Sequence, residues 1–210
     1  GRGFQGWQRQ PSGRTVQAEV ERVLERLMGT RVVAHAAGRT DAGVHALGMG
    51  VSFTVPERWQ GPELHRALNA LLPADTWVEG LSAMVPGFHA RKSATGRRYR
   101  YDVGTDAASA SPFRHPYEWA LGYPLDVVAM RWAAQLLPGT HDFHAFAVRK
   151  APEEEDGKPV EHQYRSTIRL AEWEERPGGL RFHVAADRFL HHMVRFLVGT
   201  MVDIGRGKRP

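Results

Sequence analysis

A long apolar segment near the C-terminus constrains the fold more than any other part of the chain. Most side chains between residues 188 and 204 are large and apolar: Phe189, Leu190, Met193, Val194, Phe196, Leu197, Val198, Met201, Val202 and Ile204. A helix that is apolar almost all round its circumference is buried. We therefore predict a buried helix over residues 188–204, around which a core must assemble.

Arg195 lies in the middle of this apolar segment. A buried guanidinium without an acidic partner costs on the order of several kcal/mol, so the prediction requires a carboxylate beside it. Asp41 is one candidate. A structural pair with Asp187 or Asp203, or a side chain that reaches out to solvent, is the alternative.

Asp41 itself lies in a polar loop bounded by glycines, residues 38–45, with the sequence Gly-Arg-Thr-Asp-Ala-Gly-Val-His. Arg39 and Asp41 point the same way if the loop is extended. A carboxylate kept ionised by a neighbouring cation suits a nucleophile or a general base. The alternative is a plain turn, in which Asp41 binds its own backbone and forms a local pair with Arg39.

The charge balance points to a polyanionic partner. The net charge is +5 and the isoelectric point about 9.9, and Lys and Arg make most phosphate contacts. There are no cysteines, which excludes disulfides, thiol catalysis and Cys-based zinc sites. We find neither a membrane-spanning run nor a signal peptide and expect a cytoplasmic protein. The chain opens without Met, so we expect that an N-terminal segment is missing.

Residues 1–14 mix arginines with aromatic side chains. Arginine beside exposed aromatics is typical of proteins that clamp single-stranded RNA. The alternative is that Phe4 and Trp7 pack into the core. The candidate RNA-contacting arginines here and further along the chain are Arg2, Arg9, Arg14, Arg91, Arg97, Arg98 and Arg100.

Periodicity and turn signals predict an α+β fold. Helices are expected after the Thr15 cap up to Gly29, over residues 61–72 and over residues 126–137. Strands are expected at 31–36, 51–55, 77–84 and 97–103, with a hairpin at 166–174 and 180–186. The order suggests two split β-α-β halves, residues 1–104 and 105–210.

The strand at 97–103 has two different faces. Arg97, Tyr99 and Tyr101 share one face, and Arg98 and Arg100 share the other. Such a strand can line an RNA groove; the alternative is a solvated basic face over a tyrosine-containing core. Residues 150–160, which include Glu153 to Asp156, are expected to form an exposed, inert acidic loop.

Several motifs, in order along nearly the whole chain, resemble the bacterial tRNA pseudouridine synthase A (TruA) family. They are the Asp41 loop, Phe-Gln-Gly-Trp-Gln-Arg-Gln-Pro at 4–11, Arg-Thr-Val-Gln at 14–17, residues 88–101, Gly-Thr-His-Asp-Phe at 139–143, Phe-Leu-His-His-Met-Val-Arg at 189–195, and the glycine motifs at 198–199 and 205–207. The Tyr-Asp-Gly strand that opens the family, and its C-terminal segment with an Ala-Pro-Pro run, are expected but absent.

The resemblance implies an activity and a site. The family isomerises uridines 38–40 of the tRNA anticodon stem-loop, with no cofactor and no metal, as a homodimer whose two halves share a continuous antiparallel sheet with the active cleft between them. Carried over by motif, Asp41 is the nucleophile, Tyr99 packs near the target base, Arg195 pairs with Asp41, and Arg39 helps to place the RNA. Arg91 and Arg97 are further expected substrate contacts.

Two other functions are alternatives to a synthase. A metal-dependent hydrolase could use His141, Asp142, His144, His191 and His192. Against it, adjacent residues on a helix diverge by about 100°, so His191 and His192 would point apart. A non-catalytic RNA-binding module is the second alternative.

Overall fold

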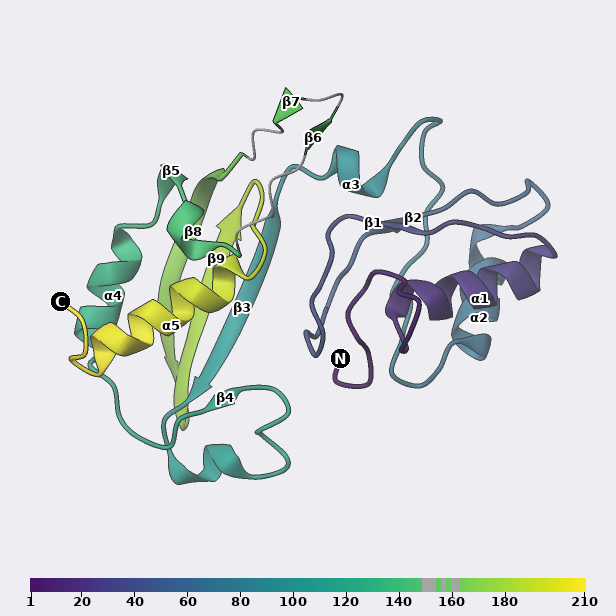
Figure 1. The fold of residues 1–210 in the computed structure, drawn as a ribbon. Coiled ribbons are helices and arrows are strands. Elements are labelled where there is room, and N and C mark those ends of the chain that lie inside the picture. The colour runs from purple at the N-terminus through teal and green to yellow at the C-terminus, as the bar shows by residue number, and fades with distance from the viewer. Residues whose placement is uncertain (149–153, 156–157, 160–162) are drawn as a thin grey trace. The chain divides into compact units, whose positions relative to one another are not determined.

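The chain forms two compact units in the computed structural model, which describes residues 1–148, 154–155, 158–159 and 163–210 (Figure 1). The first unit comprises Gly1–Ala94 and the second Thr95–Pro210. The strand predicted over residues 97–103 therefore belongs to the second unit.

The first unit is built around two helices, α1 (Val16–Met28) and α2 (Gly61–Leu71), with a short α3 (Ala90–Ser93). The Thr15 side chain accepts the Ala18 N–H at the start of α1, and Gly29 ends it in the left-handed conformation, as the sequence predicts. The apolar faces of the helices enclose a core: Trp7, Val23, Leu24, Met28, Val32, Ala34, Ala36, Leu64, Leu68 and Leu72.

Strands in the first unit are shorter than the sequence predicts. Only β1 (His35–Ala36) and β2 (Val51–Ser52) pair, in antiparallel register. Residues 77–84, all of which the structure describes, contain no strand. The Asn69 side chain takes the place of a neighbouring strand there, because it accepts the Val78 N–H at 2.8 Å and donates to the Val78 carbonyl at 2.9 Å. A side chain can satisfy backbone groups that a ladder would otherwise pair.

The second unit contains a five-stranded sheet in the order β4-β3-β9-β8-β5. Its strands are β3 (Arg97–Gly104), β4 (Trp119–Ala120), β5 (Gly139–Asp142), β8 (Arg165–Arg176) and β9 (Gly179–Ala186). All neighbours are antiparallel except β3 and β4. The 3-10 helices η1 (Ala107–Ala110) and η2 (His144–Phe146) lie in the connections, and β6 (Glu154–Glu155) pairs with β7 (Lys158–Pro159). The rest of the predicted acidic loop lies outside the described residues.

Two helices, α4 (Val127–Gln135) and α5 (Met193–Gly205), complete the second unit (Figure 1). Side chains from β3, β8, β9, α4 and α5 form one core, which includes Val103, Met130, Trp173, Phe182, Val184, Leu197 and Met201. The α+β class is thus confirmed. The finer prediction, two split β-α-β halves with one continuous sheet, stays a prediction.

The last helix begins at Met193, five residues later than the sequence predicts. His192 has φ 61° and ψ 6°, a left-handed conformation that a right-handed helix cannot include. Residues 188–192 therefore form a connection of their own between β9 and α5.

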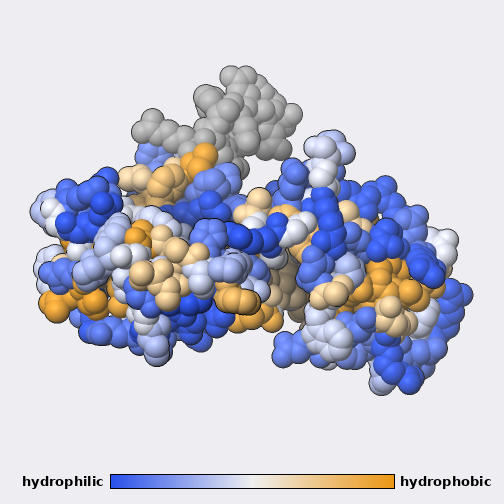
Figure 2. Space-filling view, turned by 90° about the horizontal axis from the view of Figure 1, so that it is seen from below, coloured by the Kyte–Doolittle hydropathy of each residue, from blue (hydrophilic) through white to orange (hydrophobic). Residues whose placement is uncertain are grey.

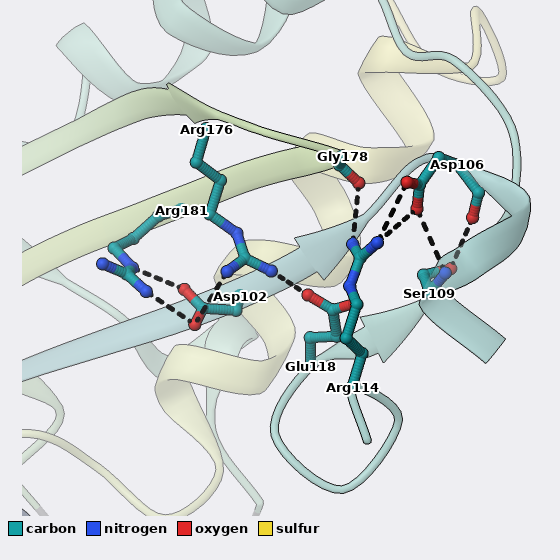
Figure 3. A network of polar contacts seen from close by, with 8 residues as sticks. All are labelled: Asp102, Asp106, Ser109, Arg114, Glu118, Arg176, Gly178 and Arg181. Carbon is teal, nitrogen blue, oxygen red and sulfur yellow. Dashed lines mark hydrogen bonds and ion pairs between the residues drawn. The ribbon is translucent and has the colours of Figure 1, made fainter. Parts of the chain in front are cut away.

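Alternating arginine and carboxylate side chains connect β3, β8 and β9 to the segment that follows β3 (Figure 3). Arg181 binds both carboxylate oxygens of Asp102, at 2.7 and 3.0 Å. Further along, Arg176 and Arg114 both pair with the Glu118 carboxylate, which is 3% exposed. Arg114 also reaches Asp106 and the Gly178 carbonyl. Each buried carboxylate thus has a guanidinium, which offsets the cost of its burial.

The face shown in Figure 2 is largely hydrophilic, with scattered apolar patches. On α4 and at its C-terminal end, Val128, Trp132 and Leu136 are exposed at a spacing of four residues. Among the described residues, no helix is long and apolar enough to cross a membrane.

Candidate active site

The Asp41 loop connects β1 to β2 and is held in place by the N-terminal segment. The Trp7 N–H donates to the Thr40 carbonyl at 3.0 Å, and the Gly43 N–H donates to the Phe4 carbonyl at 3.4 Å. A turn within the loop is closed by the Val44 N–H, which donates to the Asp41 carbonyl at 3.2 Å. Gly43 takes a φ of +79°, so this glycine serves the turn as predicted. Asp41 is half-buried on a backbone that is fixed from both sides.

Gly6 makes this close packing possible. Its φ is +89°, and a Cβ atom on it would lie 2.5 Å from the Thr40 carbonyl oxygen and 3.2 Å from the Asp41 carbonyl carbon. Both the conformation and the space therefore require glycine. The sequence prediction did not single out Gly6; its place between two aromatic residues in a motif was the available signal.

The aromatic side chains of the N-terminal segment are buried, so the prediction that they clamp RNA is wrong. Phe4 and Trp7 are each 4% exposed. Arg14 lies over the Phe4 ring at 4.1 Å and binds Asp75 and Glu19; these hydrogen bonds, to Asp75 first, raise its pKa. The alternative reading, packing into the core, is the one that the structure supports.

A buried carboxylate, Glu21 on α1, secures the chain just before the Asp41 loop. One of its oxygens accepts the Ala34 N–H at 3.0 Å and the Gln17 side-chain amide at 2.9 Å, and the other pairs with Arg9 at 2.8 Å. Gln17 also accepts the Arg9 N–H. Arg9 and Arg14 are thus both committed to carboxylates, and sequence reasoning missed Glu21 because an acidic residue on a helix is usually exposed.

In the second unit, Tyr99 lies on β3 with its ring against Phe189. The two ring centroids are 5.0 Å apart and the planes are nearly perpendicular, at 87°, the edge-to-face geometry that aromatic pairs prefer. Tyr99 and Tyr101 both pack against the core, while Arg98 and Arg100 are exposed. The predicted two faces of this strand are confirmed.

Arg195 is exposed, so the prediction of a buried guanidinium is wrong. The buried side of α5 consists of Met193, Leu197, Val198, Met201, Val202 and Gly205. At 100° per residue these positions cover about half of the helix circumference, and Arg195 lies outside that half beside Phe196, which is 43% exposed. The segment is apolar enough to resemble a fully buried helix, yet only one of its faces is covered.

The two carboxylates considered as alternative partners of Arg195 are engaged elsewhere. Asp203 lies 3.6 Å from Arg209, and Asp187 accepts hydrogen bonds from its own neighbourhood. Within the described part of the second unit, Arg195 forms no ion pair, and its charge acts on Tyr101: burial raises the pKa of the Tyr101 phenol, and Arg195 partly opposes that shift.

The remaining predicted substrate contacts occupy different positions. Arg39 is exposed in the Asp41 loop, and Arg91 is exposed on α3. Arg97 is half-buried at the start of β3, and its guanidinium donates to the Asp187 carbonyl at 2.9 Å.

Two of the residues proposed for a metal hydrolase, His191 and His192, precede α5 rather than lie within it, and their ring centroids are 4.1 Å apart, so the expectation that they point apart is wrong. The other three make local contacts with the backbone. The His141 ring lies 3.1 Å from the Pro138 carbonyl, and the Asp142 carboxylate accepts the His144 N–H at 2.8 Å. All three side chains are exposed. The His141 contact lies at the start of β5, and the Asp142 contact shapes the turn after it.

Known proteins match the chain across both units. It is 42% identical to a tRNA pseudouridine synthase A of Moorella thermoacetica over 208 residues, which cover 98% of this chain and 81% of that protein. For proteins of the same name, the identity is 43% in Halalkalibacterium halodurans (100% and 76% covered) and 40% in Myxococcus xanthus (99% and 75% covered). The chain belongs to the tRNA pseudouridine synthase A family. A family model described as tRNA pseudouridine synthase matches residues 133–210.

The aligned regions include both sets of residues described above. The family model spans the end of α4 through α5, with Arg195, whereas the relatives also align with the Asp41 loop and β3. The resemblance identified from the motifs is thereby confirmed.

Proposed function

We propose that the protein converts uridine to pseudouridine in tRNA, at positions 38–40 of the anticodon stem-loop. The observation that carries this proposal is the similarity over nearly the whole chain to proteins named tRNA pseudouridine synthase A. A half-buried carboxylate on a tightly held loop and an aromatic ring on a rigid strand support it, because catalytic groups need fixed geometry.

The reaction is an isomerisation, and its atoms balance without a second substrate. The bond between N1 of uracil and C1′ of the ribose breaks, and a bond between C5 and C1′ forms. C5 loses its hydrogen as a proton, and N1 gains one. The base must first leave the helical stack, since its reacting face is otherwise covered.

Asp41 is the catalytic residue in this proposal. Three roles fit its carboxylate: addition to the sugar, addition to the base, or removal of a proton from the sugar. Each requires the carboxylate to be ionised and fixed in position. The bonds from Trp7 and Gly43 to the loop backbone support the second requirement.

The other site residues serve the carboxylate and the RNA. Tyr99 packs on the target base, and Arg195 pairs with Asp41 to keep it charged. An exposed Arg195 on α5 is accessible for such a pair. Arg39, Arg91 and Arg97 contact the RNA.

The proposal includes an assembly and a compartment. The halves 1–104 and 105–210 contribute Asp41 and Arg195 respectively to one cleft, and their split β-α-β elements share one antiparallel sheet. The protein works in the cytoplasm as a homodimer, without cofactor or metal. Exposed apolar residues on α4 offer a surface for association. A purely monomeric mass by light scattering at micromolar concentration would contradict the homodimer.

Release of tritium from tRNA that carries 5-tritiated uridine tests the proposed reaction directly, because C5 exchanges its hydrogen for a carbon bond. The wild-type protein should release tritium from positions 38–40 and retain this activity in chelator. A protein that binds tRNA and releases no tritium is an RNA-binding module, and one whose activity is lost in chelator is metal-dependent.

A further inference from the structure

The corner between β9 and α5 is organised by one side chain, Asp187. Its backbone N–H donates to the Thr167 carbonyl at 3.1 Å, which extends the pairing of β9 with β8 by one residue. Beyond it, residues 188–192 leave the sheet and lead to α5. The position of this short connection therefore depends on how Asp187 is held.

One carboxylate oxygen, Oδ1, gathers the ends of two segments. It accepts the Thr167 N–H at 2.9 Å and the Arg188 N–H at 2.6 Å. The Ser166 hydroxyl lies 3.2 Å from the same oxygen and 2.6 Å from the Arg188 carbonyl. A hydroxyl has one hydrogen, so the shorter contact with Arg188 is the stronger of the two. Ser166 is 1% exposed, and loss of these bonds would leave buried polar groups unsatisfied.

The electrostatics of the corner favour the ionised carboxylate. Burial alone would raise the pKa of Asp187, but the hydrogen bonds from the Thr167 and Arg188 N–H groups outweigh it and hold the pKa below its ordinary value. Asp187 thus accepts hydrogen bonds as a carboxylate at neutral pH.

Two residues assigned to substrate binding or catalysis, Arg97 and Tyr99, contact this corner, and a third, Arg195, follows it on α5. Arg97 donates to the Asp187 carbonyl at 2.9 Å. The ring of Phe189, two residues beyond Asp187, lies nearly perpendicular to the Tyr99 ring, with 5.0 Å between the ring centroids. The same connection ends at His192, the N-cap of α5, and Arg195 lies in the first turn of that helix.

We propose that Asp187 is a positioning residue for this enzyme: by binding Thr167 and Arg188 it fixes the connection that sets the ring of Tyr99 and the start of α5. The proposal rests on the proposed function, in which Tyr99 packs on the base. Asp187 contacts no reacting atom. Its effect is on the rate of the bound complex, since a displacement of about 1 Å at a reacting centre can cost about 100-fold.

The test compares Asp187→Ala and Asp187→Asn with a matched control, Asp126→Ala. An asparagine keeps the Oδ1 acceptor, so Asp187→Asn should retain wild-type turnover. Asp126 also accepts a backbone N–H, that of Ala129 at 3.0 Å, but at the start of α4. We expect Asp187→Ala to lower the single-turnover rate at saturating enzyme about 10- to 100-fold, with tRNA affinity little changed, while Asp126→Ala keeps the wild-type rate despite lower thermal stability.

A second readout does not depend on activity. In protein labelled with 3-fluorotyrosine, the resonance of Tyr99, assigned with Tyr99→Phe, should shift or broaden in Asp187→Ala and stay in place in Asp187→Asn and Asp126→Ala. If the wild type shows no turnover at all, the proposed function fails, and this resonance still tests the positioning role.

Clear outcomes would overturn the proposal. They are an unmoved Tyr99 resonance in Asp187→Ala, a wild-type single-turnover rate in that variant, or an equal loss of rate in Asp126→Ala. If Asp187→Ala does not fold, Ser166→Ala replaces it, because it removes only the hydroxyl bond to the same corner. That variant should shift the Tyr99 resonance and slow the reaction to a smaller extent, and an unchanged resonance and rate would refute the role.

Discussion

Gly6 and Thr40 approach so closely that a Cβ atom on Gly6 would lie 2.5 Å from the Thr40 carbonyl oxygen. This contact joins the N-terminal segment to the residue just before Asp41. The position of the proposed catalytic carboxylate is therefore set partly by a glycine that is distant in sequence and carries no chemistry of its own.

Gly6→Ala should displace the Asp41 loop and lower turnover strongly. A positive φ costs a non-glycine residue about 1–2 kcal/mol, and the clash with Thr40 adds to it. Gly29→Ala is the matched control, because Gly29 has a φ of +75° with nothing within 4 Å of its Cβ position. The melting temperature should fall in both variants and fall further in Gly6→Ala. Tritium release should decrease only in Gly6→Ala. Equal activity in the two variants would count against the contact.

Asp41→Ala should abolish pseudouridine formation while tRNA binding largely persists. No other carboxylate lies in the loop of residues 38–45, and a catalytic group must be held within about 0.5 Å of its productive geometry. Binding is spread over many phosphate contacts. Single-turnover tritium release beside a filter-binding titration separates the two effects. Turnover close to wild type would remove Asp41 from the mechanism.

Arg195→Ala should lower turnover with little loss of stability. The side chain is exposed, and exposed substitutions usually change the free energy of unfolding by no more than about 0.5 kcal/mol. Removal of its charge leaves Asp41 without the proposed partner. Arg206→Ala, just beyond α5, is the control: it loses the contact of Arg206 with the Tyr123 ring, 5.0 Å from its centroid, and should keep wild-type tritium release. A large drop in the melting temperature of Arg195→Ala alone would point to a structural role instead.

The long elements of the second unit could be predicted because local signals and burial agree there, whereas the short strands β4 and β5 were not predicted. The hairpin of β8 and β9, the two faces of β3 and the helix α4 follow from alternation, turn residues and apolar periodicity. The start of α5 was misplaced because apolar periodicity continues through residues 189–192, whereas the left-handed His192 separates them from the helix. Nothing in residue type alone reveals that conformation.

The motifs in the sequence led to Asp41 and Tyr99, but the residues that hold them depend on contacts between distant segments. Glu21, Gly6 and Asp187 act through partners 13 or more positions away in the chain, such as Ala34, Thr40 and Thr167. At Arg195 the local pattern was misleading. An arginine in an apolar segment was predicted to be buried, although only one face of its helix is covered.

Arg98 and Arg100 should contribute to tRNA affinity more than arginines that are already paired. Both are exposed on the same face of β3, and within the described residues neither forms an ion pair with a carboxylate. In contrast, the exposed Arg131 pairs with Glu175 at 2.9 Å. Arg98→Ala and Arg100→Ala should each weaken binding and reduce the slope of log affinity against log salt by about 1. Arg131→Ala serves as the control with a wild-type slope; equal slopes in all three variants would contradict the assignment.

The pair of Asp102 and Arg181 should make the second unit more stable at neutral than at acid pH. The Asp102 side chain is 10% exposed. Burial alone would raise its pKa, but the hydrogen bonds and charge of Arg181, with the charge of Arg176, outweigh burial and lower it. In the unfolded chain the pKa of an aspartate is about 3.9. The folded state therefore binds the proton more weakly, and the stabilisation is complete above about pH 4 and is lost as the pH falls through the folded pKa.

Asp102→Asn tests this sign, because asparagine keeps the shape of the side chain without its charge. Chemical unfolding from pH 7 downward should show the wild type more stable than the variant by a constant margin at neutral pH. The margin should shrink below about pH 4, as the wild-type carboxyl becomes protonated. The same comparison in proteins that also carry Arg181→Leu tests whether Arg181 is the cause. In that background, the difference in stability between Asp102 and its Asn variant should be smaller at neutral pH. A margin that stays the same with and without Arg181 would show that this guanidinium does not stabilise the ionised Asp102.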